Sequence, residues 1–118
     1  MKVVKKKDDS FKIFTLRIDE AVMGQLDNFV KKEKVSKMRL AEAVIKTSLK
    51  ENHFKNEENK VYENTGRVRT LTLRLKLTLI KRIDSAANKC DCSRQQLVES
   101  ILQKALSDKS FIVEVIVE

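Results

Sequence analysis

The chain has 118 residues, 42% of them apolar, with 25 Lys and Arg against 17 Asp and Glu and a formal net charge of +8. This apolar fraction supports one small folded domain and excludes general disorder, while the basic excess makes an anionic partner the first hypothesis. No apolar run approaches the roughly 18 residues of a membrane-spanning helix, and the basic start of the chain lacks the apolar stretch of a secretion signal. We therefore expect a cytoplasmic protein without a membrane partner.

The chain is poor in groups that serve catalysis or bind metals. Its single histidine, His53, lies in a polar stretch, and its two glycines cannot build a phosphate-binding loop. Cys90 and Cys92 do not make a disulfide framework, and a metal site there would need two further ligands. No nucleophile, base and orienting group can be nominated together. We therefore expect no catalysis, no metal site and no cofactor.

An internal repeat organises the chain. Residues 13–49 align without a gap on residues 70–106, at a constant offset of 57. The identical pairs are Thr15/Thr72, Leu16/Leu73, Arg17/Arg74, Asp27/Asp84, Lys32/Lys89, Ser36/Ser93, Leu40/Leu97, Glu42/Glu99 and Leu49/Leu106. Most other pairs keep their polarity, which indicates two copies of one structural unit.

Each copy opens with a short strand, because residues 13–18 and 70–75 alternate apolar and polar side chains. The side chains predicted to face a core are Phe14, Leu16, Ile18, Leu71, Leu73 and Leu75. The opposite face then carries Ile13, Thr15, Arg17, Thr70, Thr72 and Arg74. A lone strand leaves its backbone groups unpaired, so we expect the two segments to pair with each other as an antiparallel ribbon.

Two helices follow the strand in each copy. The first is predicted from apolar stripes at helical spacing, namely Val22, Leu26, Phe29 and Val30, and Leu79, Ile83, Ala86, Ala87 and Cys90. Ser36 and Ser93 then stand where an N-cap belongs. The second helix carries Leu40, Val44, Ile45 and Leu49 in one copy, and Leu97, Val98, Ile101, Leu102 and Leu106 in the other.

The predicted fold is therefore mainly α, with four helices packed on a two-stranded antiparallel ribbon. The predicted organisation is a first unit at 11–50, a polar linker at 51–66, a second unit at 67–108 and a strand-like C-terminal tail at 109–118. Neither unit is large enough to be stable alone, so the two should share one core.

This order of elements resembles the ribbon-helix-helix (MetJ/Arc) superfamily of DNA-binding proteins over about 75 residues. The matching segments are Thr15-Leu16-Arg17-Ile18, Thr72-Leu73-Arg74-Leu75, Ser36-Lys37 and Ser93-Arg94. Two units in one chain resemble the TraY family of conjugative-plasmid proteins, which bind DNA near a transfer origin and also regulate transcription. The resemblance implies a pseudo-two-fold intramolecular dimer. One departure is that the family often has Gly in the turn between the helices, where this chain has Lys34 and Asp91.

The resemblance implies a ribbon inserted in the major groove of DNA, where base edges are distinguishable. Arginine can donate two hydrogen bonds to guanine, threonine can bond to several bases or touch a thymine methyl, and isoleucine makes only apolar contact. The expected base contacts are Ile13, Thr15, Arg17, Thr70, Thr72 and Arg74. The alternative for these residues is a plain solvent-facing sheet surface.

The start of each second helix is the expected phosphate contact, because a helix N-terminus offers free N–H groups and a partial positive charge. The residues concerned are Ser36, Lys37, Ser93 and Arg94, for which ordinary capping is the alternative. Lys12, Arg67 and Arg69 are possible arms along the DNA backbone. The run Lys5–Lys7 fits such an arm and a solvated charge run equally well.

The expected function is sequence-specific binding of double-stranded DNA, as a relaxosome accessory factor at a transfer origin or as a transcriptional regulator. A relaxase or another transfer protein would then be a protein partner. Ile13 and Thr70 hold equivalent positions in the repeat but differ in chemistry, so the target should lack perfect two-fold symmetry. The alternative function is that of an antitoxin-like interaction module, whose segment 111–118 binds a partner or a second copy. Two other possibilities for this segment are that it packs within the molecule or that it pairs with residues 2–4.

Overall fold

The computed structural model describes residues 11–51, 65–108 and 110–115, and the fold is described for these. Their elements follow the order β1 (Phe11–Asp19), α1 (Glu20–Glu33), α2 (Lys37–Glu51), β2 (Val68–Lys76), α3 (Leu77–Lys89) and α4 (Arg94–Ser107). The predicted mainly α fold with four helices and one two-stranded antiparallel sheet is confirmed for the described residues. The run Lys5–Lys7 and most of the predicted linker lie outside them.

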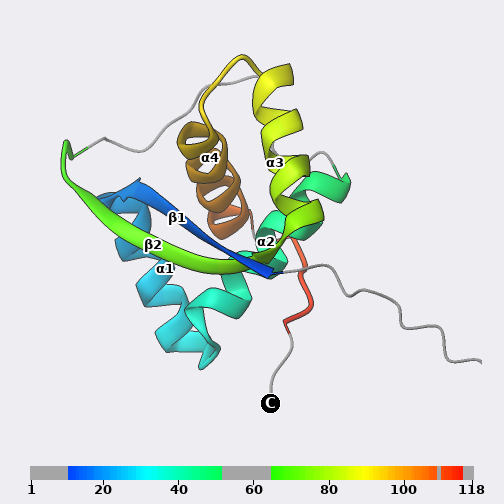
Figure 1. Cartoon of the computed structure of the whole chain (residues 1–118). Coiled ribbons are helices and arrows are strands. Elements are labelled where there is room, and N and C mark those ends of the chain that lie inside the picture. Colours follow the sequence, from blue (N-terminus) through cyan, green and yellow to red (C-terminus); the bar gives the residue numbers. More distant parts are fainter. Residues whose placement is uncertain (1–10, 52–64, 109, 116–118) are drawn as a thin grey trace, which may run out of the picture.

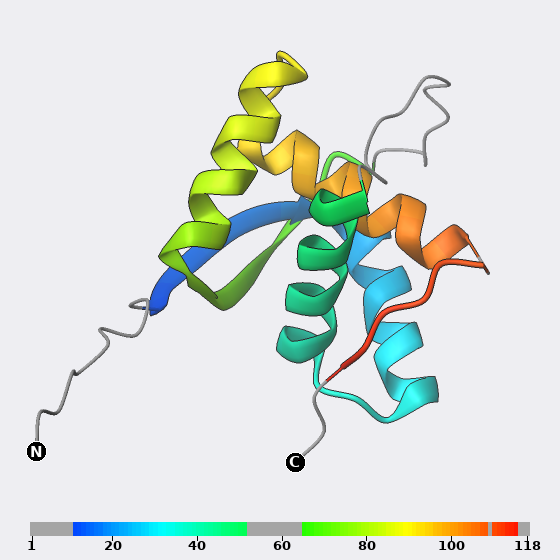
Figure 2. The same ribbon diagram turned by 90° about the vertical axis from the view of Figure 1, so that its right-hand side faces the viewer.

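The two strands form one long ribbon in antiparallel register. Thr15 stands opposite Thr72, with Ile13 opposite Arg74 and Arg17 opposite Thr70. In Figure 1 the ribbon crosses in front of the helices, with α3 above it and α1 below it. In Figure 2, which shows the molecule turned by 90°, the C-terminal segment runs from the end of α4 past α2. The strands that the alternation predicts are thus present, each longer than predicted.

One core lies between the ribbon and the four helices. The alternating strand residues Phe14, Leu16, Ile18, Leu71, Leu73 and Leu75 are all at most 6% exposed. From the helices the core takes Val22, Met23, Leu26, Leu40, Ala41, Val44, Ile45, Leu79, Ile80, Ile83, Ala86, Ala87, Leu97, Val98, Ile101 and Leu102. Side chains of both copies therefore share one hydrophobic cluster, as their small size predicts.

The predicted helical stripes are buried along most of their length, with two exceptions. Phe29, predicted to face the core, is 36% exposed, because it lies near the end of α1, where that helix extends past the core. Cys90 is exposed, because it is the C-cap residue of α3 and not part of its buried stripe. Both errors fall at helix ends, where periodicity alone does not define how far the packed face extends.

The turns between the helices have the same backbone geometry in both copies. Lys34 and Asp91 adopt the left-handed conformation, with φ of 58° and 54°. In each turn, the residue after the left-handed one donates its backbone N–H to the carbonyl five residues earlier. The distance is 3.3 Å from the Val35 nitrogen to the Val30 oxygen, and 3.1 Å from the Cys92 nitrogen to the Ala87 oxygen. This is the Schellman motif, which usually places Gly at the left-handed position. The turn therefore keeps its shape without Gly, at a cost in backbone strain.

The described part of the C-terminal tail, residues 110–115, belongs to no helix or strand. Phe111, Val113 and Val115 pack against the core, whereas Ile112 is 80% exposed. Among the described residues the tail joins no sheet, since the only sheet there consists of β1 and β2. The alternation that predicts a strand is real, but the inner side chains lie on helices and not beside another strand.

Candidate nucleic-acid interface

The outward face of the ribbon brings together all the predicted base-contacting side chains. Because side chains alternate along a strand, the residues between the buried positions point away from the helices. The exposed set is Ile13, Thr15, Arg17, Thr70, Thr72 and Arg74. We call these six residues the ribbon face. Residues directly opposite in an antiparallel pair have Cβ atoms about 4.5–5.5 Å apart, so the ribbon face is one continuous surface.

The ribbon face carries only positive or neutral groups. Lys76, which is exposed at the end of β2, adds a third cation beside the two arginines of the ribbon face. The only carboxylate in either strand is Asp19, and it is 2% exposed and turned inward. A surface of this kind attracts a polyanion and offers hydrogen-bond donors.

The start of α2 lies beside one end of the ribbon face. Met38, Arg39 and Glu42 of α2 line a shallow depression together with Arg74 of β2. Residues from a helix N-terminus and from the ribbon thus border a common hollow, which places a predicted phosphate-contacting element next to a predicted base-contacting side chain.

Ser36 and Ser93 stand at the starts of α2 and α4, as predicted. The Ser93 hydroxyl accepts from the N–H of Gln96 over 3.0 Å, and the Gln96 side-chain oxygen accepts from the Ser93 N–H over 2.9 Å. This reciprocal pair is a capping box. In the first copy, Ser36 accepts from the N–H of Arg39 over 3.4 Å. The capping interpretation of both serines therefore holds, and the second cap is the more complete.

The cation that follows each serine is held by an aspartate of the preceding helix. Lys37 Nζ lies 2.8 Å from Asp27 Oδ1. Arg94 binds Asp84 through two nitrogens, each over 2.8 Å, and its guanidinium lies 4.9 Å from the centre of the Phe14 ring. The two ion pairs stand at equivalent positions of the repeat. A phosphate oxygen that approaches either helix start would compete with a carboxylate for the cation.

Of the two aspartates, Asp27 and Asp84, Asp27 pairs with two basic side chains. It accepts from Lys37 and also from Arg69, whose Nη1 lies 2.7 Å from its second oxygen. Hydrogen bonding from Lys37 and then from Arg69, with the charges of both, holds the pKa of Asp27 below its usual value, against the opposing effect of burial. The carboxylate of Asp27 is therefore charged throughout the neutral range.

The three predicted arm residues lie differently from one another. Lys12 and Arg69 stand opposite Leu75 and Ile18, on the helix-facing rows of their strands, and both are exposed. Arg69 is bound to Asp27, and Arg67 Nε lies 2.8 Å from Glu20 Oε2. Two of the three arms are thus held against α1 by ion pairs that sequence reasoning missed.

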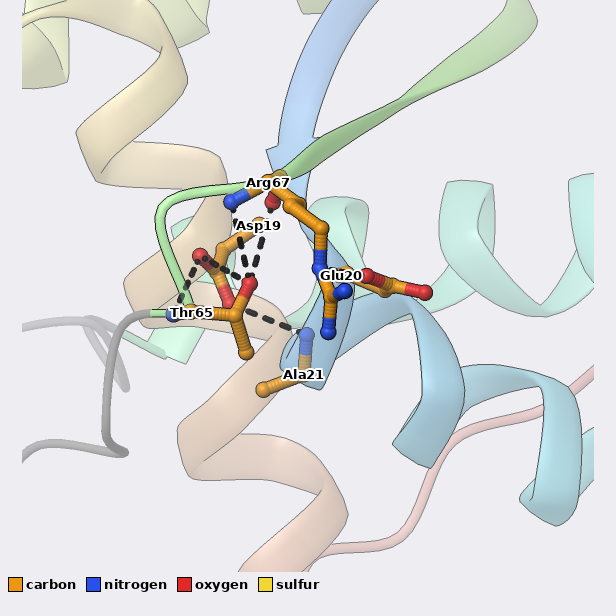
Figure 3. Close-up of polar contacts among 5 residues, drawn as sticks. All are labelled: Asp19, Glu20, Ala21, Thr65 and Arg67. Atoms are coloured by element: carbon orange, nitrogen blue, oxygen red, sulfur yellow. Dashed lines mark hydrogen bonds and ion pairs between the residues drawn. The ribbon is translucent and has the colours of Figure 1, made fainter.

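A polar cluster fixes this end of the ribbon (Figure 3). The buried Asp19 carboxylate caps α1 by accepting from the N–H of Ala21 over 2.9 Å, and its other oxygen accepts from the Thr65 N–H over 3.0 Å. The Asp19 N–H donates to Glu99 of α4 over 2.7 Å, and the Glu20 N–H donates to the Arg67 carbonyl over 2.9 Å. The chain entering β2 is thereby bound to the chain leaving β1.

Neither cysteine is part of a metal-binding group in the described ranges 11–51, 65–108 and 110–115, where no cluster of three or more suitable side chains occurs. Both thiols are free. Burial, followed by the neighbouring Cys90 and Asp91, raises the pKa of the partly buried Cys92. Within the same ranges, no helix has the length and apolarity needed to cross a bilayer.

No protein-family model, curated protein or solved structure matches this chain.

The acids Asp27 and Asp84 are functional-site neighbours that the sequence prediction left out. One signal was present, because both are identical residues of the repeat and each precedes a cation by ten positions. Glu99 is also an identical residue of the repeat, but its partner Asp19 corresponds to Lys76. No spacing indicates the contact between Asp19 and Glu99, since eighty residues separate them along the chain.

Proposed function

We propose that this chain is a non-catalytic, sequence-specific double-stranded DNA-binding protein that inserts the β1–β2 ribbon into the major groove. The observation that carries the proposal is the ribbon face, which presents two arginines and three threonines on one exposed surface. A two-stranded ribbon fits the major groove, and these side chains are suited to hydrogen bonding with base edges.

We further propose that the fold is a tandem ribbon-helix-helix arrangement with pseudo-two-fold symmetry. The strand register supports this, because Thr15 stands opposite Thr72, its own equivalent in the repeat. Rotation about this pair exchanges Ile13–Arg74 with Arg17–Thr70. The repeated left-handed turn residues, Lys34 and Asp91, and the repeated ion pairs at the helix starts also agree with it.

In this arrangement Ser36, Lys37, Ser93 and Arg94 would contact phosphates that flank the groove. Such contacts fix the register of the protein on the duplex without distinguishing sequences. The first backbone N–H groups of a helix lack an intrahelical acceptor and can donate to a phosphate oxygen. Those of Arg39 and Gln96 donate to the serine caps instead. Lys37 and Arg94 add a full charge there once a phosphate replaces the aspartate as their partner.

The decisive test replaces both arginines of the ribbon face. A good bidentate contact is worth about 1–3 kcal/mol of discrimination, so Arg17→Ala with Arg74→Ala should lower affinity for the preferred site by about 2–6 kcal/mol. Weak, salt-sensitive binding to other sequences should survive. Titration of a selected duplex and of a random duplex, at two salt concentrations, measures both effects.

Two matched variants separate charge from position. Arg17→Lys with Arg74→Lys keeps the charge but removes the planar fork, so it should lose specificity and retain non-specific affinity. Lys46→Ala with Lys81→Ala removes the same charge from exposed helix positions and should leave the preference for the selected site intact. Unchanged specific affinity in the double alanine variant would show that the ribbon face does not contact bases.

The biological role we propose is that of a relaxosome accessory factor at a transfer origin, with a relaxase or another transfer protein as partner, or else that of a transcriptional regulator. Both roles require the same contacts between the protein and DNA. A footprint beside a nick site would select the first, and a footprint over a promoter would select the second.

The alternative is a protein-interaction module whose C-terminal segment binds a partner. We rank it second because Phe111, Val113 and Val115 pack on the chain's own core, which leaves fewer apolar side chains to offer. A stoichiometric partner that co-purifies with the full chain and is lost on deletion of residues 111–118 would favour the alternative.

A further inference from the structure

The two halves of the ribbon face differ at one position. Thr15 and Thr72 are equivalent, as are Arg17 and Arg74, but Ile13 in the first strand corresponds to Thr70 in the second. All the other base-contacting positions are matched. Within the ribbon face, this pair is therefore the one place where the two halves can differ in base preference.

The register gives the two arginines different neighbours. Arg74 lies directly opposite Ile13, which is 73% exposed, whereas Arg17 lies directly opposite Thr70. The two arginines are thus chemically identical but have an apolar companion in one half and a hydroxyl in the other. We call these the isoleucine half and the threonine half.

Charge at the ends of the ribbon adds to this difference. The isoleucine half continues to Lys76, which is exposed. The equivalent position in the threonine half holds Asp19, which is buried and whose carboxylate caps α1. The isoleucine half therefore presents two cations and an apolar side chain, and the threonine half presents one cation and a hydroxyl, with the half-exposed Val68 at its end.

Isoleucine and threonine make different demands on a base edge. A threonine hydroxyl donates or accepts, and its methyl also contacts thymine. Isoleucine has no hydrogen-bonding group, so it is compatible with the thymine methyl and leaves other base edges dehydrated without a partner. The isoleucine half should be the stricter of the two beside its guanine.

We propose, resting on the DNA-binding function above, that the chain binds its site in one orientation. The site has a guanine contacted by arginine in each half and a thymine beside that guanine only in the isoleucine half. Ile13 and Thr70 are the residues that set the orientation, and the Lys76 end adds phosphate attraction on the same side.

The test selects bound duplexes from a random pool, with the electrophoretic complex that carries one chain per duplex being retained. The wild type should give an asymmetric consensus. Ile13→Thr makes the base-contacting positions of the two halves alike and should give a two-fold symmetric consensus, and Thr70→Ile should give a symmetric one with thymine in both halves. Both changes are at exposed strand positions, and thermal unfolding of each variant checks that the fold is unchanged.

A second measurement uses the selected wild-type site with single thymines replaced by deoxyuridine. Loss of one methyl from a buried contact corresponds to roughly a fourfold loss of affinity. That loss should occur in the isoleucine half and should disappear in the Ile13→Thr variant.

The outcomes separate the two levels of the proposal. A symmetric wild-type consensus, or an asymmetry that Ile13→Thr leaves unchanged, would overturn the orientation rule while leaving DNA binding intact. Failure of every protein, wild type included, to enrich any sequence would overturn the proposed function itself.

Discussion

Ser48 of α2 and Ala105 of α4 hold equivalent positions in the two copies, yet only one of them fits its surroundings well. Ser48 is fully buried, and its hydroxyl has no hydrogen-bond partner among the residues that the structure describes. A buried hydroxyl without a partner has lost its water without replacement. The second copy avoids this cost, because Ala105 carries no polar atom.

Ser48→Ala should therefore stabilise the protein by about 1–2 kcal/mol, since the unsatisfied hydroxyl is removed and alanine also favours the helix. Chemical denaturation of both proteins measures the difference. Ser85→Ala, at an exposed position of α3, controls for helix propensity and should change stability by only about 0.5 kcal/mol. Equal effects of the two substitutions would show that burial of the Ser48 hydroxyl has no cost.

The Asp27 carboxylate predicts a pH dependence of stability. Its pKa in the folded chain lies below the ordinary aspartate value of 3.8, so the folded state binds fewer protons than the unfolded state between the two values. The ion pairs then contribute stability that is complete above about pH 5 and is lost as pH falls through the folded pKa. Asp27 and Lys37 are each about one third exposed, which limits the contribution to about 0.2–1 kcal/mol.

Asp27→Asn should lower stability at pH 7 by this amount, and the difference from the wild type should shrink below pH 4. Denaturation curves of the two proteins at several pH values measure it, because the other carboxylates titrate in both and cancel. A difference that stays constant down to pH 2 would contradict the role of these ion pairs.

At the scale of elements, the sequence predicts strands, helix order and ribbon pairing well. Alternation in the strands and helical spacing in the stripes result directly from burial of one face, and a lone strand needs a partner. The ion pair between α1 and α2 does not follow from the sequence, because the distance from Asp27 to Lys37 depends on how the two helices cross. The tail is predicted to be strand-like but joins no sheet among the described residues. Alternation shows which of its residues face inward but not which elements they face.

The helix caps differ in quality, which leads to a prediction at this scale. Ser93→Ala removes the complete capping box of α4 and should cost about 1–2 kcal/mol. Ser36→Ala removes a single long hydrogen bond at the start of α2 and should cost about 0.5 kcal/mol. Thermal or chemical unfolding of both variants tests the order. A larger loss for Ser36→Ala would mean that the cap geometry is the reverse of that described.

At the scale of the whole molecule, stability is shared between the copies. Helices of the first copy pack on α4 of the second, and both strands add side chains to one cluster. The C-terminal segment then covers part of that cluster with Phe111, Val113 and Val115. Unfolding should therefore be a single transition, with the tail included in it.

Deletion of residues 111–118 should lower stability by about 2–4 kcal/mol, since three half-buried apolar side chains are lost. Phe111→Ala with Val113→Ala should reproduce most of this loss. Ile112→Ala, in the same segment but exposed, should change stability by no more than about 0.5 kcal/mol. A deletion without any effect on the unfolding midpoint would mean that the tail does not pack in solution.

The pairing of β1 with β2 inside one polypeptide has a further consequence. A ribbon built from two separate chains disappears on dilution, because each strand must find a second molecule. Here the partner strand is always present at the effective concentration set by the connecting segment. The surface is therefore complete at any copy number, and occupancy of a DNA site would depend on concentration to the first power.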